Sequence, residues 1–375
     1  MKDIREVNEG DFGDILNCIN AGVYITDTER RIVFWNRAAE LITGHRAQDV
    51  LGRPCSDDIL KHVDKDGREL CTTDLCPLHR SMILAAPSEA PILVYAISTS
   101  GRRLPLSTST APVFDEAGNV IGGVEVFRDE RENIRQMELA RTVQRQMLTQ
   151  ALPEDERVSF AVEYAPAELV GGDFYHVGRL SADEFIVFLA DAAGHGVSAA
   201  LYSALVYSLI LECQEWLGDP ARLMAELNAR ACSRAEGLGF FTAVCARLDT
   251  DGRTLTFTAA GHPPLLYQHA GGEVELLEMS QLPVGVHAEA SYENRTVSLT
   301  RGDRLLAYSD GATDIPTGGP PGGEGRLGIE GLRALVAQHP PAEGHELTGL
   351  YEALMERCVA VQAEDDITLV SCLVL

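Results

Sequence analysis

Four aspartates stand next to apolar runs, two of them directly beside a glycine, and their order along the chain constrains the fold more than any other feature. They are Asp173 in GGDFY, Asp191 in FLADAAGHG, Asp310 in LLAYSDG and Asp365 in EDDITLV. Short apolar runs of this kind predict buried strands, so the carboxylates are expected at strand ends. Carboxylate oxygens are the ligands that Mg²⁺ and Mn²⁺ prefer. The sequence therefore predicts a fold that gathers four distant strand ends around hard divalent cations.

Length and charge limit the class of protein. A chain of 375 residues is long enough for two or three domains. A net charge of −25 repels phosphate backbones, which argues against nucleic-acid binding. No apolar stretch is long enough for a membrane span, and no leader is recognised, so a cytoplasmic protein without a membrane partner is expected. The nine cysteines, an odd number, indicate free thiols rather than a disulfide framework.

Three segments differ in pattern. Residues 11–128 alternate between strand-like runs and short helices. Residues 129–152 contain neither glycine nor proline and are rich in strong helix formers, and Pro153 ends that helix. Residues 154–375 hold seven strand-like runs around helices near 196–217, 220–235, 329–338 and 345–361. The predicted fold class is α+β, with domains at 11–128 and 154–375 joined by a helical linker at 129–153.

The linker carries a narrow apolar stripe. Its members step by three and four residues along the helix: Ile134, Met137, Ala140, Val143, Met147 and Leu148. Such a stripe suits a short two-stranded coiled coil. A solvated spacer helix is the alternative. A dimerising signalling helix is favoured, because a lone helix with so thin a stripe gains little by burial.

The first segment is similar to PAS sensor domains. The resemblance rests on GVYITD (22–27), RIVFWNRAAELITG (31–44), the glycine of VLGRP and GNVIGGVEVFRD (118–129), in that order and spacing. It implies a five-stranded antiparallel sheet flanked by helices, which encloses a ligand pocket or forms a dimer surface.

A group of thiols lies within this PAS-like segment. Cys55, Cys71 and Cys76 occur close to His62 and His79. Three thiolates and an imidazole could bind zinc or an iron–sulfur cluster, so Cys55, Cys71, Cys76 and His62 are candidate cofactor ligands. Their spacing is not a standard zinc motif. A redox role, another bound ligand and buried structural thiols therefore stay open, and Cys18 on the first helix could join the group.

The last segment resembles the metal-dependent (PPM) protein phosphatases, in particular the SpoIIE/RsbU branch. The matching pieces are ARTVQRQML (140–148), LVGGDFY (169–175), DAAGHGVSAAL (191–201), AGHPPLL (260–266), LPVG (282–285), RGDRLLAYSDG (301–311) and EDDITLV (364–370). The resemblance implies an α–β–β–α sandwich with the metal site at one edge of two stacked antiparallel sheets.

The same resemblance implies roles for the aspartates. Asp191 is expected to bridge two Mn²⁺ or Mg²⁺ ions. Asp173 and Asp310 each complete one coordination shell together with Asp365, and the main-chain carbonyl of Ala192 supplies a further oxygen. Two such ions lower the pKa of a shared water from about 15.7 to near 7, which supplies a nucleophile without a protein side chain.

Some assignments stay open in the sequence. Asp366 adjoins Asp365 and could be the ligand instead, but Asp365 is preferred because relatives often carry Asn at the second position. His195 could protonate the leaving group or could pack in the GHG turn, and the same alternatives apply to His262. The sequence indicates no arginine that would clamp a substrate phosphate.

The resemblances together imply a PAS-regulated, Mn/Mg-dependent serine/threonine protein phosphatase. Its substrate would be phosphoserine on a STAS-type anti-sigma-factor antagonist, with a separate anti-sigma kinase in the same pathway. A homodimer through the PAS domain and the linker is expected. One alternative is a PAS-gated binding or scaffold protein with an inactive phosphatase-like domain, against which the complete set of aspartates argues. Another is a metal-dependent phosphatase of small molecules.

Overall fold

The computed structural model describes residues 9–57, 59–64, 67–71, 73, 75–88, 90–194, 196–234, 239–318, 325–340, 347–359 and 364–375, with side chains described from residue 13 onward. The chain divides into two compact units, Met1–Gln136 and Met137–Leu375. The division falls inside the linker helix α5 (Arg131–Leu148), so each unit contains part of that helix.

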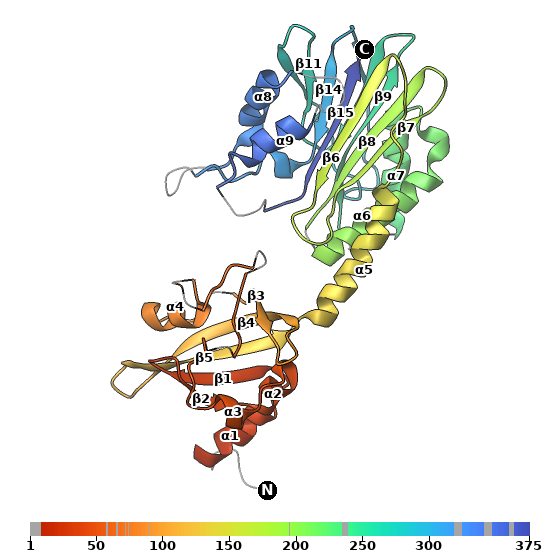
Figure 1. Ribbon diagram of the computed structural model, residues 1–375. Helices are drawn as coiled ribbons and strands as arrows, with labels where there is room; N and C mark the ends of the chain where they lie inside the picture. Colours follow the sequence, from red (N-terminus) through yellow and green to blue (C-terminus); the bar gives the residue numbers. More distant parts are fainter. Residues whose placement is uncertain are drawn as a thin grey trace. The chain divides into compact units, whose positions relative to one another are not determined.

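The first unit is built on one five-stranded sheet with the order β2-β1-β5-β4-β3 (Figure 1). Every pairing is antiparallel, which confirms the sheet expected from the PAS resemblance. The strands are β1 (Gly22–Asp27), β2 (Ile32–Trp35), β3 (Ile92–Ile97), β4 (Arg103–Phe114) and β5 (Val120–Asp129). The helices are α1 (Glu9–Asn17), α2 (Arg37–Thr43), α3 (Ala47–Val50) and α4 (Pro77–Leu84).

Asn36 fixes how α1, β1 and α2 meet. Its side-chain oxygen accepts hydrogen bonds from the backbone N–H of Ala39, as the N-cap of α2, and from that of Val23 in β1. Its amide nitrogen donates to the carbonyl oxygens of Leu16 and Ala21 at 2.9 Å each. Asn36 is fully buried with these groups satisfied, which is the condition under which a polar side chain is tolerated in a core.

The second unit contains two five-stranded antiparallel sheets, with the orders β13-β10-β9-β8-β7 and β12-β11-β14-β15-β6. The strands are β6 (Val158–Ala165), β7 (Phe174–Arg179), β8 (Glu184–Ala192), β9 (Phe241–Asp249), β10 (Thr254–Ala260), β11 (Leu265–Gln268), β12 (Val274–Leu277), β13 (Arg295–Ser298), β14 (Arg304–Tyr308) and β15 (Ile367–Val374). Phe185, Val244 and Phe257 of the first sheet and Leu305 and Val370 of the second belong to one buried cluster, so the sheets are stacked face to face.

Helices cover the outer faces of both sheets (Figure 1). Helices α6 (Gly196–Glu212) and α7 (Pro220–Arg234) pack on the first sheet, around a core that includes Phe188, Leu209 and Leu227. Helices α8 (Gly328–Gln338) and α9 (Thr348–Met355) pack on the second sheet. The four layers confirm the expected α–β–β–α sandwich. Across the described residues, α6 included, no helix has the length and apolarity to cross a membrane.

The linker helix is buried on one side only. Gln144 and Leu148, near its C-terminal end, are buried within the second unit. Val143 of the predicted apolar stripe is 47% exposed, and Leu139, which lies outside that stripe, is 67% exposed, so apolar side chains of this helix face solvent in the single chain.

Candidate metal centre

Strand pairing brings the predicted aspartates to neighbouring strand ends. In the first sheet Phe174 at the start of β7 pairs with Ala190 near the end of β8, which places Asp173 and Asp191 close together. In the second sheet Tyr308 at the end of β14 pairs with Leu369 near the start of β15. Asp310 and Asp365 therefore lie at one end of that strand pair.

The carboxylates of the two sheets also interact with each other. Burial, together with the charges of Asp310, Asp365 and Asp366, raises the pKa of Asp191 to about 8. The Asp191 and Asp310 carboxyls share a hydrogen bond. Burial followed by the charge of Asp365 also raises the pKa of Asp310. The group thus carries negative charges that repel one another.

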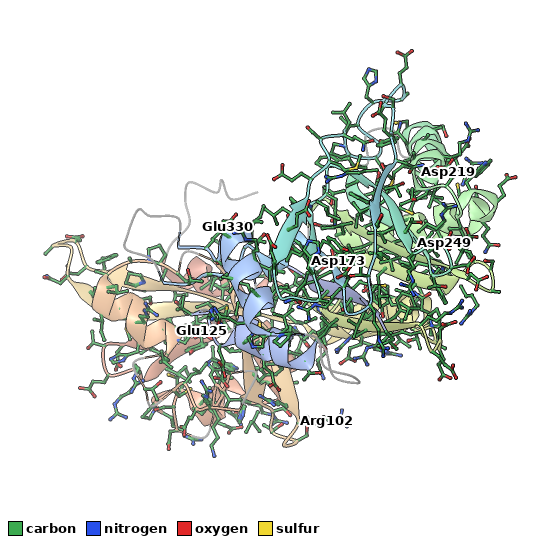
Figure 2. All side chains as sticks on the ribbon, turned by 90° about the horizontal axis from the view of Figure 1, so that it is seen from above. Arg102, Glu125, Asp173, Asp219, Asp249 and Glu330 are labelled. Carbon is green, nitrogen blue, oxygen red and sulfur yellow. The ribbon has the colours of Figure 1, made fainter. Side chains whose placement is uncertain are left out.

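Asp173, labelled in Figure 2, is the most deeply buried member, with 1% of its surface exposed. The Thr368 hydroxyl donates a hydrogen bond to its Oδ2. Its Oδ1 has no hydrogen-bond partner among the described atoms. Burial, followed by the charges of Asp191 and Asp366, raises the pKa of this carboxyl. A buried carboxylate oxygen without a partner is costly unless a cation or a proton satisfies it.

Gly172 lies close to the main-chain carbonyl of Ala192. A Cβ built on Gly172 would lie 3.0 Å from the Ala192 oxygen and 3.0 Å from the Ala199 Cβ. Gly172 therefore lets the backbone before Asp173 approach the end of β8 closely. This brings the carbonyl oxygen to the edge where Asp173 and Asp191 lie.

A second glycine, Gly311, lets the residues just before β15 lie close to the turn that carries Asp310. A Cβ on Gly311 would lie 2.1 Å from the backbone oxygen of Asp366. Ser309 reinforces the contact, because its hydroxyl donates to that oxygen at 3.0 Å and accepts from the Thr368 N–H at 2.9 Å. At this turn Gly311 is thus required for packing, next to Asp310, the candidate ligand.

Asp366 uses its side chain to hold the backbone. Its two carboxylate oxygens accept hydrogen bonds from the N–H groups of Ala167, at 2.8 Å, and Gly172, at 2.5 Å. It is 7% exposed, whereas Asp365 is only partly buried. The oxygens of Asp366 are committed to the chain, and this favours Asp365 as the freer carboxylate. The choice of Asp365 as ligand remains a prediction.

The donor set suits a divalent cation in chemistry. Carboxylate and carbonyl oxygens are the ligand types of Mg²⁺ and Mn²⁺, and both occur here. The carboxylates repel one another, and one of their oxygens lacks a hydrogen-bond partner in the part of the chain that the structure describes. Among the described residues, however, no group of three or more Asp, Glu, His or Cys side chains is arranged so that it could hold a metal ion as it stands. Metal binding would therefore need side-chain adjustment within the group.

Of the two histidines considered as proton donors, His262 is among the described residues. His195 lies outside the described residues. His262 is buried, its Nδ1 lies 3.0 Å from the Thr242 hydroxyl, and burial lowers its pKa to about 3. A ring with so low a pKa stays neutral at pH 7, so His262 is suited to packing rather than to proton donation.

Gln144 on α5 was not singled out from the sequence, although it contacts the loop before Asp173. Its amide nitrogen donates to the Gly171 carbonyl at 2.5 Å and to the Ser203 hydroxyl at 3.0 Å. Its oxygen accepts from the Gly171 N–H at 3.1 Å. A polar residue four positions from both Ala140 and Leu148, on the apolar side of a packed helix, is the signal that could have indicated it.

The thiols of the first unit lie in its core. Cys55, Cys71, Cys76 and His62 are all at most 4% exposed. The His62 N–H donates to the Cys71 sulfur at 3.1 Å, and burial raises the pKa of Cys55 and Cys71 to about 12. These thiols are therefore protonated at pH 7. Cys18 is exposed and contributes nothing to this buried group.

A buried acid also faces this group. Glu125 on β5, labelled in Figure 2, accepts a hydrogen bond from the Tyr24 hydroxyl at 2.9 Å, and its other oxygen lies 3.7 Å from His62 Nε2. Burial raises the pKa of Glu125 to about 8 and lowers that of His62 to about 4. The signal in the sequence was the alternation of β5, where Glu125 occupies an inward position two residues before Phe127.

Comparison with known families agrees with the two folds. Residues 181–374 match the family described as Stage II sporulation protein E (SpoIIE), and residues 20–132 match the PAS domain family. Phosphoserine phosphatase RsbP of Bacillus subtilis (strain 168) is 28% identical over 184 residues, which are 48% of this chain and 45% of RsbP. Phosphoserine phosphatase RsbU of the same organism is 25% identical over 237 residues, which are 63% of this chain and 69% of RsbU.

A solved structure shares the second fold. The SiaA-PP2C domain of Pseudomonas aeruginosa is 26% identical, with a TM-score of 0.56, and the match covers 64% of this chain and 97% of that domain. This chain spans less than half of the length of RsbP. The SpoIIE match covers just over half of this chain. The chain therefore belongs to the SpoIIE family, with a PAS domain ahead of its PP2C-type phosphatase fold.

Proposed function

We propose that the chain is a serine/threonine protein phosphatase that depends on Mn²⁺ or Mg²⁺ and is regulated through its PAS domain. The observation that carries this proposal is the meeting of Asp173, Asp191 and Asp310 from separate strand ends, where desolvation and neighbouring carboxylates raise the pKa of each carboxyl. Membership of the SpoIIE family supports the same activity.

In this proposal Asp191 would be shared by two ions. Asp173, through its unpartnered Oδ1, Asp310, Asp365 and the Ala192 carbonyl would complete the ligand set. When bound, two divalent ions would neutralise charge on a phosphoryl group and make a water molecule acidic enough to act as the nucleophile.

The remaining residues of the group hold the ligands in place. Asp366 ties Gly172 to the entrance of β15, and Thr368 holds one oxygen of Asp173. Ser309 fixes the turn that carries Asp310. Catalysis by positioned charges requires such support, because a displaced ligand loses the geometry that the transition state needs.

We further propose phosphoserine on a STAS-type anti-sigma-factor antagonist as the substrate, with the opposing anti-sigma kinase on a separate protein. The similarity to two proteins named phosphoserine phosphatases, RsbP and RsbU, supports phosphoserine. The net charge of −25 is consistent with a protein substrate rather than a nucleic acid.

Regulation would pass through α5. Gln144 in its second half bonds to the loop that precedes Asp173, so a shift of the helix would move a proposed ligand. The exposed Leu139 and Val143 offer an apolar surface to a second copy of the helix. Size measurement by light scattering, with Leu139→Lys as a disrupting variant, tests the dimer.

The PAS thiols remain a candidate cofactor or redox site. Metal analysis and an absorption spectrum of anaerobically purified protein would detect zinc or an iron–sulfur cluster. Colourless, metal-free protein that still folds would favour structural thiols.

The activity itself is tested with p-nitrophenyl phosphate, with and without Mn²⁺. We expect Mn²⁺-dependent turnover that Asp191→Asn and Asp310→Asn reduce to background while circular dichroism stays native. Asp251→Asn, in an exposed turn, is the matched control and should be active. Absence of turnover in the native chain would favour the binding or scaffold alternative. Faster turnover of metabolite phosphates than of a phosphoserine protein would favour the small-molecule alternative.

A further inference from the structure

Arg326 lies against two acidic residues that adjoin the aspartate group. Its guanidinium donates to the Asp314 carboxylate and, at 3.4 Å, to Glu364 Oε2. The Asp314 N–H donates to the Asp310 carbonyl oxygen at 2.9 Å, so the two residues are neighbours in this turn. Glu364 directly precedes Asp365 in the chain. A positive charge is therefore placed beside the Asp310 and Asp365 side of the group.

The backbone holds Arg326 in a defined position. It forms an antiparallel bridge with Pro316. On either side of this bridge, the Thr317 N–H donates to the Gly325 carbonyl and the Leu327 N–H to the Ile315 carbonyl, at 2.5 and 2.9 Å. Ile315 is buried, so this short ladder is anchored in the core just after the turn that carries Asp310.

The ion pairs of Arg326 are easily exchanged. Its side chain is 51% exposed, and those of Asp314 and Glu364 are 46% and 59% exposed. Exposed pairs of this kind contribute little to stability, because water screens them. A guanidinium donates two parallel N–H bonds to a phosphate, and such charge-assisted pairs are stronger than ordinary hydrogen bonds. A dianionic phosphate at the aspartate group could thus take Arg326 from its acidic partners at small cost.

We propose that Arg326 binds the phosphoryl group of the substrate, and that Asp314 and Glu364 hold the guanidinium in place while no substrate is bound. This inference rests on the proposed phosphatase activity and assigns the contact to phosphate monoester dianions. It gives the site the phosphate-binding arginine that the sequence pattern did not indicate.

The test compares steady-state kinetics of p-nitrophenyl phosphate hydrolysis in the full chain with Mn²⁺. For Arg326→Gln we expect KM to rise about tenfold, with kcat within about threefold of the native value. The inhibition constant of inorganic phosphate should rise in parallel. Arg326→Lys, which keeps the charge but not the paired donors, should show an intermediate KM. Arg333→Gln is the matched control, since Arg333 is an exposed arginine of α8 paired with Glu330 at 3.3 Å, and it should match the native enzyme.

Glu364→Gln separates phosphate binding from a structural role. If Arg326 only fastened its loop, Glu364→Gln would reproduce the loss seen in Arg326→Gln. If it binds phosphate, Glu364→Gln should leave KM unchanged or lower it. Native protein without Mn²⁺-dependent turnover would overturn the proposed function itself. Active native protein, with KM and phosphate inhibition unchanged in both arginine variants, would overturn this inference alone. Should Arg326→Gln fail to fold, an unchanged KM in Arg326→Lys would be sufficient to reject it.

Discussion

Gln144 and Gly171 are hydrogen-bonded in both directions. The amide nitrogen of Gln144 donates to the Gly171 carbonyl at 2.5 Å, and the Gly171 N–H donates to the Gln144 oxygen at 3.1 Å. A side-chain amide can satisfy a backbone amide in this way only if both are held in register. The pair therefore fixes α5 to the loop two residues before Asp173.

Gln144→Leu should destabilise the second unit. The substitution leaves both polar groups of Gly171 buried without their partner, at a cost of about 1–3 kcal/mol. We expect the free energy of unfolding to fall by about 2 kcal/mol, measured by urea titration of the fluorescence of Trp216. Gln146→Leu, at an exposed position of the same helix, is the control and should change it little. Equal effects in the two variants would show that the pair has no special role.

The neighbours Asp365 and Asp366 should respond differently to the same change. Asp366→Asn replaces one acceptor by a donor that faces a backbone N–H, and we expect a loss of about 1–3 kcal/mol in stability. Asp365→Asn should alter stability little but reduce Mn²⁺-dependent turnover about 100-fold or more. Denaturation curves and initial rates measure both quantities, and the opposite pattern would make Asp366 the ligand.

Gly311→Ala should disturb the turn that carries Asp310. The added Cβ would lie 2.1 Å from the backbone oxygen of Asp366, so one of two backbone segments must move. Overpacking of this kind costs about 1–3 kcal/mol. Gly349→Ala on α9 is the control, because nothing lies within 4 Å of its added Cβ. It should be neutral or stabilising by up to about 1 kcal/mol. Differential scanning calorimetry would rank the two, and a Gly311→Ala protein as stable as the control would contradict the contact.

The first unit should lose stability as pH rises from 6.5 towards 8. Burial raises the pKa of Glu125 from 4.5 to about 8, so the folded state keeps a proton that the unfolded state releases, and this contribution is lost as pH approaches 8. Burial lowers the pKa of His62 from 6.5 to about 4, so the unfolded state binds a proton in this range that the folded state does not. The contribution of His62 to the free energy of unfolding is therefore lost as pH falls from 6.5 to about 4. The two slopes oppose each other between pH 4.5 and 6.5.

Above pH 6.5 only the Glu125 slope remains, at about 1.4 kcal/mol per pH unit. Urea titration of Trp35 fluorescence at pH 6.5 and 8 should therefore differ by about 2 kcal/mol. Glu125→Gln keeps the acceptor for Tyr24 without a titrating proton and should remove that difference. A persistent slope in this variant would assign the effect to another group.

Local pattern predicted the strands and singled out the aspartates, whereas the layered architecture followed from the resemblance to the PPM phosphatases. The apolar runs next to Asp173, Asp191 and Asp310 are strands, and their antiparallel pairing places these residues at neighbouring strand ends. The pattern could not rank Asp365 against Asp366. That distinction depends on which carboxylate receives the N–H groups of Ala167 and Gly172, about two hundred residues earlier in the chain.

Other features depend on contacts that no local pattern specifies. The stripe on α5 indicated which side of the helix is apolar, but the contact of Gln144 with Gly171 depends on tertiary packing. Glu125 and His62 meet only because β5 lies in the middle of its sheet. The position of Arg326 depends on its backbone pairing with Pro316.

The bond from Thr368 to Asp173 and those from Asp366 to the preceding loop join the last strand to residues made far earlier. During synthesis on the ribosome, Asp173 and Asp191 emerge long before residues 365–368. A nascent polypeptide that stops short of that point cannot assemble the aspartate group. Any enzymatic activity is therefore withheld until translation of this unit is almost complete.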